Sequence, residues 1–169
     1  MSMPQTQSLC YPVQVLTTHS HIQGTMEPIG PVINYLNDVD RRHIPLLEAT
    51  VSPLTTNPLG QVARSQLIIP KNDIVALYLD DAAARSGFQL LRRIERSIFY
   101  MPSLVCRAEF HLGIDTRWQD MLGLLVGDFF AVTNATVFPL IALPGPFPQQ
   151  TDLLVLNRLH VQMLHPDQA

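Results

Sequence analysis

The chain has 169 residues, of which 47% are hydrophobic and 15% are charged, and its formal net charge at pH 7 is −3. This composition excludes an intrinsically disordered protein, because such chains carry more charge and fewer apolar residues. Lys71 is the single lysine among eleven basic residues. The chain therefore has little positive charge for following a phosphate backbone, which disfavours nucleic acid as a partner.

The apolar stretches and the two cysteines indicate the cellular compartment in which the protein is expected. No uncharged apolar run reaches the roughly 18 to 20 residues that a membrane span requires, so we expect no transmembrane segment. Cys10 and Cys106 are far apart and follow no C-x-x-C pattern, which argues against a disulfide framework and a zinc site. Residues 1–10 predict a flexible tail without a secretory signal. We therefore expect a cytoplasmic protein.

Strand patterns dominate residues 11–79, which we interpret as a first repeat. Alternating apolar residues indicate strands, and proline, glycine and asparagine clusters indicate the turns between them. Pro31 suits the first position of a short helix. The predicted elements are strands Tyr11–Thr18 and Ile22–Met26, helix Val32–Asp38, strand Ile44–Leu54, and a final hairpin of Ala63–Ile69 and Ile74–Leu79.

A helix is predicted over residues 80–100, where it would connect the two halves of the chain. Apolar residues recur there at spacings of three and four, which is typical of one helix face. The opposite side would carry Arg85, Arg92 and Arg96, which could bind an acidic partner. A solvated face is the simpler interpretation, because Glu95 and neighbouring aspartates dilute the charge.

Residues 101–166 are interpreted as a second repeat with the same course. Thr116 can cap its helix, and a proline-rich loop follows its long strand. The predicted elements are strands Leu104–Cys106 and Phe110–Ile114, helix Arg117–Val126, strand Phe130–Leu140, and a final hairpin of Leu153–Leu156 and His160–Leu164.

The case for a repeat comes from sliding the sequence by 86 positions. This shift places Ala49-Thr50-Val51-x-Pro53-Leu54 on Ala135-Thr136-Val137-x-Pro139-Leu140. The halves share strand and turn positions and no reactive side chains. We therefore predict a strand-rich α+β fold of two tandem ββαβββ repeats, each like a small barrel, related by a pseudo-twofold axis and packed together because each alone would be marginally stable.

The first half also resembles a known group of domains. The residues that carry the resemblance are Ile22-x-Gly24, Tyr35-Leu36-Asn37-Asp38, Ile44-Pro45-Leu46, Ala49-x-Val51 and Ile69-x-Lys71-x-x-Ile74. They resemble small uncharacterised bacterial domains classed as a domain of unknown function, and we interpret these as small barrels of the Sm-like kind. The resemblance implies no catalytic residues. The second half departs from it, with Val126-Gly127-Asp128 in place of the Leu-Asn-Asp segment and Asn157-Arg158 in place of the lysine.

Two further features are candidate sites. His19 and His21 have the spacing of one strand face and could hold a metal with a third ligand. With no acid or cysteine cluster nearby, hydrogen-bonded histidines are the simpler interpretation, and we assign no metal. Phe147 lies in the stretch Leu143-Pro-Gly-Pro-Phe-Pro148, where a stiff, exposed aromatic ring could anchor a partner, although a plain loop is the simpler interpretation.

The sequence contains no nucleophile motif and no glycine-rich phosphate loop, so we expect neither an enzyme nor a cofactor. We expect a non-catalytic protein-binding or assembly module that joins itself or another protein through a sheet edge or the proline-rich loop. A membrane-surface partner is disfavoured. Two alternatives stay open, an Sm-like nucleic-acid-binding protein and a small-molecule sensor with a pocket between the repeats.

Overall fold

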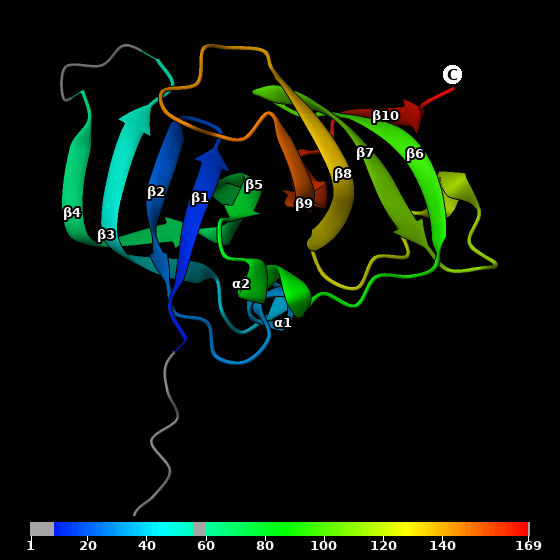
Figure 1. The fold of residues 1–169 in the computed structure, drawn as a ribbon, viewed down its shortest axis with the longest axis horizontal. Helices are drawn as coiled ribbons and strands as arrows, with labels where there is room; N and C mark the ends of the chain where they lie inside the picture. The colour runs from blue at the N-terminus through cyan, green and yellow to red at the C-terminus, as the bar shows by residue number, and fades with distance from the viewer. Residues whose placement is uncertain (1–8, 56–59, 169) are drawn as a thin grey trace, which may run out of the picture.

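The computed structural model describes residues 9–55 and 60–168, in which ten strands form one sheet with two short α-helices (Figure 1). The predicted tail, residues 1–10, lies largely outside the described residues. The strands are β1 Tyr11–Thr17, β2 Ser20–Met26, β3 His43–Pro53, β4 Val62–Pro70, β5 Ile74–Leu79, β6 Arg93–Tyr100, β7 Leu104–Leu112, β8 Phe129–Pro139, β9 Gln150–Asn157 and β10 Met163–Pro166. The helices are α1 Val32–Asn37 and α2 Ala82–Ser86.

The sheet is open, with the strand order β10-β6-β7-β8-β9-β5-β1-β2-β3-β4 and antiparallel pairing between all neighbours. The predicted small barrels are therefore wrong. A barrel in the first half would require β5 to close onto β4. Instead β5 pairs with β1 on one side and with β9 of the second half on the other.

The two halves have the same strand order. The first half runs β5-β1-β2-β3-β4 and the second runs β10-β6-β7-β8-β9. They meet where β5 pairs with β9, through Ala76 opposite Leu156 and Leu77 opposite Val155. A twofold axis at this joint would also pair β10 with β4, and these two strands are instead the outer edges of the sheet. The strand pairing thus follows a head-to-tail order and not the predicted pseudo-twofold arrangement.

Most predicted elements of the first half are confirmed. All its predicted strands and the short helix occur within a few residues of their expected bounds. Pro31 precedes α1 with φ −59°, which suits the entry to a helix. The buried face of α1 consists of Val32, Tyr35 and Leu36. The predicted hairpin of β4 and β5 is wrong, because the 3₁₀ turn Lys71–Asp73 redirects the chain so that β4 pairs with β3 and β5 with β1.

The predicted connecting helix over residues 80–100 is wrong for most of its length. Only α2 is helical there, capped by the Asp81 side chain, which accepts a hydrogen bond from the Ala83 amide at 2.7 Å. Residues 93–100 instead form β6, whose aromatic and β-branched residues favour a strand. Pairing of all eight β6 residues with β7 outweighs the helical spacing of the apolar side chains.

The second half also differs from its predicted elements. The strands expected at Leu104–Cys106 and Phe110–Ile114 are one continuous strand, β7. The helix expected at Arg117–Val126 is reduced to a 3₁₀ turn over Trp118–Asp120, and Gly123 lowers helix propensity within this segment. β10 pairs with β6, so the expected final hairpin with β9 does not form.

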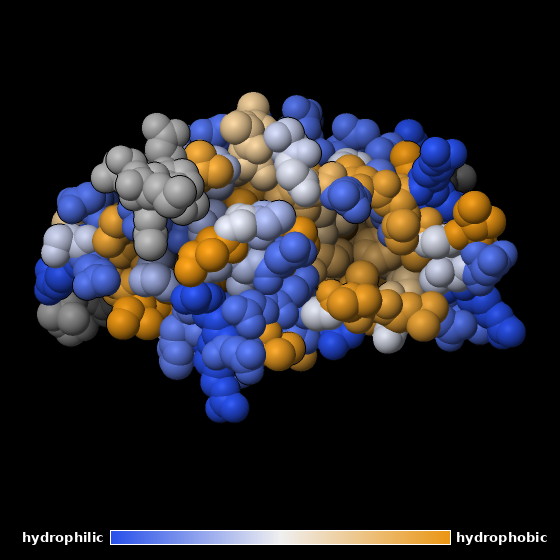
Figure 2. All heavy atoms as spheres, turned by 90° about the horizontal axis from the view of Figure 1, so that it is seen from below, coloured by the Kyte–Doolittle hydropathy of each residue, from blue (hydrophilic) through white to orange (hydrophobic). Residues whose placement is uncertain are grey.

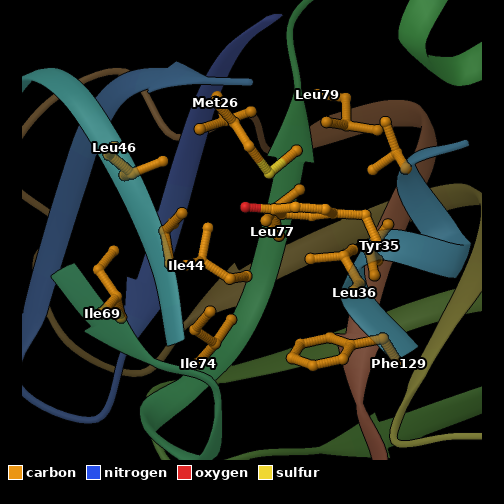
Figure 3. Close-up of a cluster of buried hydrophobic side chains, with 14 of the residues drawn as sticks. Met26, Tyr35, Leu36, Ile44, Leu46, Ile69, Ile74, Leu77, Leu79 and Phe129 are labelled. Atoms are coloured by element: carbon orange, nitrogen blue, oxygen red, sulfur yellow. The ribbon is translucent and has the colours of Figure 1, made fainter. Parts of the chain in front are cut away.

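Two hydrophobic cores meet at the joint strands. Leu77 of β5 and Val155 of β9 belong to the core of the first half, whereas Ala76 of β5 and Leu156 of β9 belong to the core of the second. Alternate residues of a strand point to opposite faces, so both faces of these strands are buried. Phe129 of the second half packs into the first core, beside α1 and β5 (Figure 3). The halves therefore share their cores.

The outer surface is mixed in polarity. Figure 2 shows hydrophilic atoms over much of the face that carries the helices, with hydrophobic atoms gathered around a hollow on the side of the second half. Exposed apolar residues of that half include Ile114, Leu124 and Val126. Within residues 9–55 and 60–168, no helix has the length and apolar character needed to cross a membrane.

Candidate functional site

A polar cavity of about 620 Å³ opens beside the joint between the halves. We call it the joint pocket. The first half contributes the end of α1, the segment leading into β3 and the turn after β4, and the second half contributes the start of β8 and the residue after β9. Its walls are Leu36, Asn37, Asp38, Val39, Arg41, Arg42, His43, Pro70, Lys71, Asn72, Gly127, Asp128, Phe129 and Arg158.

The Asn37 side chain joins the two halves at this pocket. Its Nδ2 donates to the Phe129 carbonyl at 2.9 Å, and its Oδ1 accepts from the Phe129 amide at 2.9 Å. The amide thereby satisfies both backbone groups of Phe129, as a neighbouring strand would. Gly127 lies directly against Asn37, with φ +88°, and a Cβ atom added there would come within 2.3 Å of Asn37 Cγ. This contact requires glycine at position 127.

Lys71 holds the end of α1 from the turn between β4 and β5. Its buried Nζ donates to the carbonyls of Tyr35 at 3.2 Å and Asp38 at 2.9 Å. A cation at a helix C-terminus is favourable, because the last carbonyls there have no partner within the helix. Burial lowers the pKa of Lys71, Asp38 and Asp128 oppose that effect, and Arg41 adds to it. Lys71 is therefore a positioning residue of the joint pocket.

Arg158 has a similar role in the second half. Its Nη1 donates to the carbonyls of Leu122 at 3.3 Å and Leu125 at 3.2 Å, and its Nε lies 3.1 Å from Asp128 Oδ1. These carbonyls belong to the segment that precedes β8, as those bound by Lys71 belong to the segment that precedes β3. Each half thus places a cation after its fourth strand to hold the segment before its third.

Asn157 ties the two halves together beneath this pocket. It is fully buried, and its Nδ2 donates to the carbonyls of Ile74 at 2.8 Å and Lys71 at 3.3 Å. Its Oδ1 accepts from the Leu159 amide at 3.0 Å. The side chain therefore satisfies backbone groups from both halves.

The structure separates the residues predicted to bind a partner. Phe147 is only 7% exposed and packs edge-on to His21, with ring centroids 5.9 Å apart, so the exposed setting predicted for this ring in the proline-rich loop is wrong. Arg85 lies in α2, Arg92 in the following loop and Arg96 in β6, so the three do not share a helix face. Arg96 lies 4.0 Å from Glu109 on the neighbouring strand.

The two histidines of the predicted pair have different surroundings. His19 is exposed at the turn between β1 and β2. His21 is buried, with Nδ1 2.6 Å from the Pro144 carbonyl and Nε2 3.0 Å from Gln14 Oε1. Among the described residues, no group of three or more His, Cys, Asp or Glu side chains could hold a metal ion. His21 instead connects β2 to the proline-rich loop of the second half.

His21 should make stability depend on pH. Burial lowers its pKa, and the hydrogen bond to the Pro144 carbonyl offsets part of that effect. As the pH falls through about 6.5, the unfolded chain takes up a proton that folded His21 resists, so the free energy of unfolding falls. We expect the His21→Gln variant to lose this part of the pH dependence between about pH 7.5 and 5.5 in urea unfolding. Equal slopes for the variant and the original chain would contradict the role of His21.

The second cysteine has the surroundings of a core residue. Cys106 is fully buried in β7, and burial raises the pKa of its thiol to about 12. A thiol with so high a pKa is a poor nucleophile at neutral pH. The structure therefore gives Cys106 a packing role.

The residues of the joint pocket were only partly visible in the sequence. Asn37 and Lys71 are among the residues that carry the resemblance to the domains of unknown function, and that resemblance implies no role for them. Gly127, Asp128 and Arg158 lie where the second half departs from it. Their partners lie far away along the chain, so no local pattern identifies the pairs. Comparison of the chain with protein-family models, with curated proteins and with solved structures found no match.

Proposed function

We propose that this protein is an assembly module whose copies join head to tail through the two outer edges of the sheet. One observation carries the proposal. Within the chain, the halves are joined by pairing β9, the fourth strand of its half, with β5, the fifth strand of the other. The outer edges are again a fourth strand, β4, and a fifth strand, β10. Pairing β4 of one copy with β10 of the next would repeat the internal joint.

We further propose that the two halves are copies of one five-strand unit. Among the described residues, Glu48 and Asn134 are the two non-glycine residues with positive φ, and both have φ 46°. They occupy corresponding places in β3 and β8, at the same shift of 86 positions at which the sequence repeats. An uncommon backbone conformation at matched positions supports duplication better than shared apolar residues do.

The outer edges have the chemistry that strand addition requires. An edge strand carries backbone groups without a neighbouring strand, and proteins that avoid association place charges or prolines along it. β4 is nine residues long, with Ile68 63% exposed, and β10 is short, with Met163 55% exposed. Arg64 is the one charged residue of β4, and the prolines of the two strands, Pro70 and Pro166, are their last residues, which leaves the rest of each edge able to pair. An interface between two different edges builds a closed ring or an open chain of copies.

Lysine on the exposed edge strand β4 should separate the copies. In sedimentation velocity, we expect the original chain to form species above its mass of 18.9 kDa and the Ile68→Lys variant to sediment as a monomer. The matched control is Leu124→Lys, which adds the same charge at a residue that is 64% exposed and belongs to neither edge strand. This variant should assemble normally. A monomeric original chain, or equal effects of the two variants, would contradict the proposal.

A further inference from the structure

We propose that the joint pocket binds a phosphate-bearing small molecule through the guanidinium groups of Arg41 and Arg42. Ligand binding there does not require assembly through the sheet edges, although Pro70, the last residue of β4, lines the cavity. It gathers four cationic side chains against two carboxylates in a chain whose net charge is −3. The cations are Arg41, Arg42, Lys71 and Arg158, and the carboxylates are Asp38 and Asp128. The chain thus concentrates positive charge, including its single lysine, in one cavity.

Most of these charges already have partners within the protein. Arg158 binds Asp128 and two backbone carbonyls, and Lys71 binds two carbonyls at the end of α1. Asp38 Oδ1 accepts a hydrogen bond from the Asp40 amide at 3.0 Å. The two arginines of the segment between α1 and β3 are therefore the groups best placed to meet a ligand.

Arg41 has the surroundings of a preorganised anion-binding residue. Its guanidinium carbon lies 4.6 Å from the centre of the Tyr35 ring, which fixes the side chain at the pocket wall. Its Nε is buried and has no hydrogen-bond partner in the described structure. Because Nε is closed to solvent, the terminal nitrogens of the guanidinium would donate to an anion in the cavity that Arg41 lines. Arg42, which is exposed at the same cavity, can supply a second fork of donors.

The chemistry of the donors and the size of the cavity identify the class of ligand. Guanidinium groups match the oxygens of phosphate, to which they can donate two parallel hydrogen bonds. A cavity of about 620 Å³ lies in the range of small-molecule sites and exceeds what a single phosphate group fills. Leu36, Pro70 and Phe129 add apolar wall for the rest of the molecule. A phosphate monoester of about nucleotide size fits this description.

Calorimetric titration of the full chain tests the site with three probes, inorganic phosphate, adenosine 5′-monophosphate and adenosine. We expect the two phosphate-bearing probes to bind saturably, adenosine to bind at least tenfold more weakly than its monophosphate, and added salt to weaken the phosphate-bearing probes. Absence of saturable binding by both phosphate-bearing probes, or equal binding of adenosine and its monophosphate, would overturn the proposal.

Two substitutions and one control locate the binding. Arg41→Gln and Arg42→Gln should each weaken binding of adenosine 5′-monophosphate about tenfold or more, because each removes a charged donor. Arg92→Gln removes the same charge from an exposed loop residue outside the pocket and should leave binding unchanged. Thermal unfolding checks that each variant is folded, and exposed Arg42 keeps the test valid if Arg41→Gln proves unstable. Unchanged binding by Arg42→Gln, or an equal loss by Arg92→Gln, would overturn the assignment.

Discussion

Replacing Gly127 by alanine should lower the free energy of unfolding by about 3 kcal/mol or more. Two costs combine at this position. The backbone has φ +88°, which disfavours any side chain, and the added Cβ would lie 2.3 Å from Cγ of Asn37. The side chain of Asn37 would have to move, and its two hydrogen bonds to Phe129 would be lost. Equilibrium unfolding in urea measures the change.

Gly30 provides the matched control for Gly127. It also has positive φ, +77°, but a Cβ atom added there would meet nothing within 4 Å. Gly30→Ala should therefore cost only the backbone term of about 1 to 2 kcal/mol. The difference between the two variants measures the contact between the halves. Equal losses of stability in the two variants would show that the contact with Asn37 adds nothing to the cost of Gly127→Ala.

Replacing Asn157 by alanine should destabilise the protein by about 3 kcal/mol. The fully buried amide satisfies carbonyls of Ile74 and Lys71 and the amide of Leu159. Truncation leaves the two carbonyls without their partner at buried positions, which costs more than the hydrogen bonds contributed. The midpoint of urea unfolding should shift without a change in the steepness of the transition.

The control for Asn157 is Asn72→Ala, an exposed residue in the turn beside Lys71. It removes the same atoms and should change the free energy of unfolding by no more than about 0.5 kcal/mol. A comparable loss from both variants would contradict the buried network as the cause.

The sequence predicted the first half well because its signals are local. Alternation of apolar residues identifies β1 to β3, and Pro31 marks the start of α1. The apolar run Ile74–Leu79 was recognised as a strand. Its burial on both faces follows from the distant strand β9, which no local pattern identifies.

The errors arose where one pattern fits two structures. The spacing of Ile94 and Ile98 suits a helix face, but both residues also lie on one face of a strand, because they are separated by an even number of positions. Pairing with β7 decided between these readings. Phe147 was predicted to be exposed because its neighbours are turn residues, whereas His21, far away in the sequence, covers it.

The joint pocket could not be predicted from the sequence for the same reason. Asn37 and Phe129 are separated by 92 positions, and Asn157 and Lys71 by 86. Such contacts depend on the register between β5 and β9, which periodicity does not specify. The internal repeat gave the one usable hint, since it placed Asn157-Arg158 in the position of Lys71.

The most direct test of head-to-tail assembly is a mixing experiment with two edge variants. Ile68→Lys blocks β4 and leaves β10 intact, whereas Met163→Lys blocks β10 and leaves β4 intact. Each variant alone should be monomeric by light scattering, and an equimolar mixture should give a one-to-one complex of twice the chain mass of 18.9 kDa. A mixture that stays monomeric, or either variant assembling alone, would contradict pairing of β4 with β10.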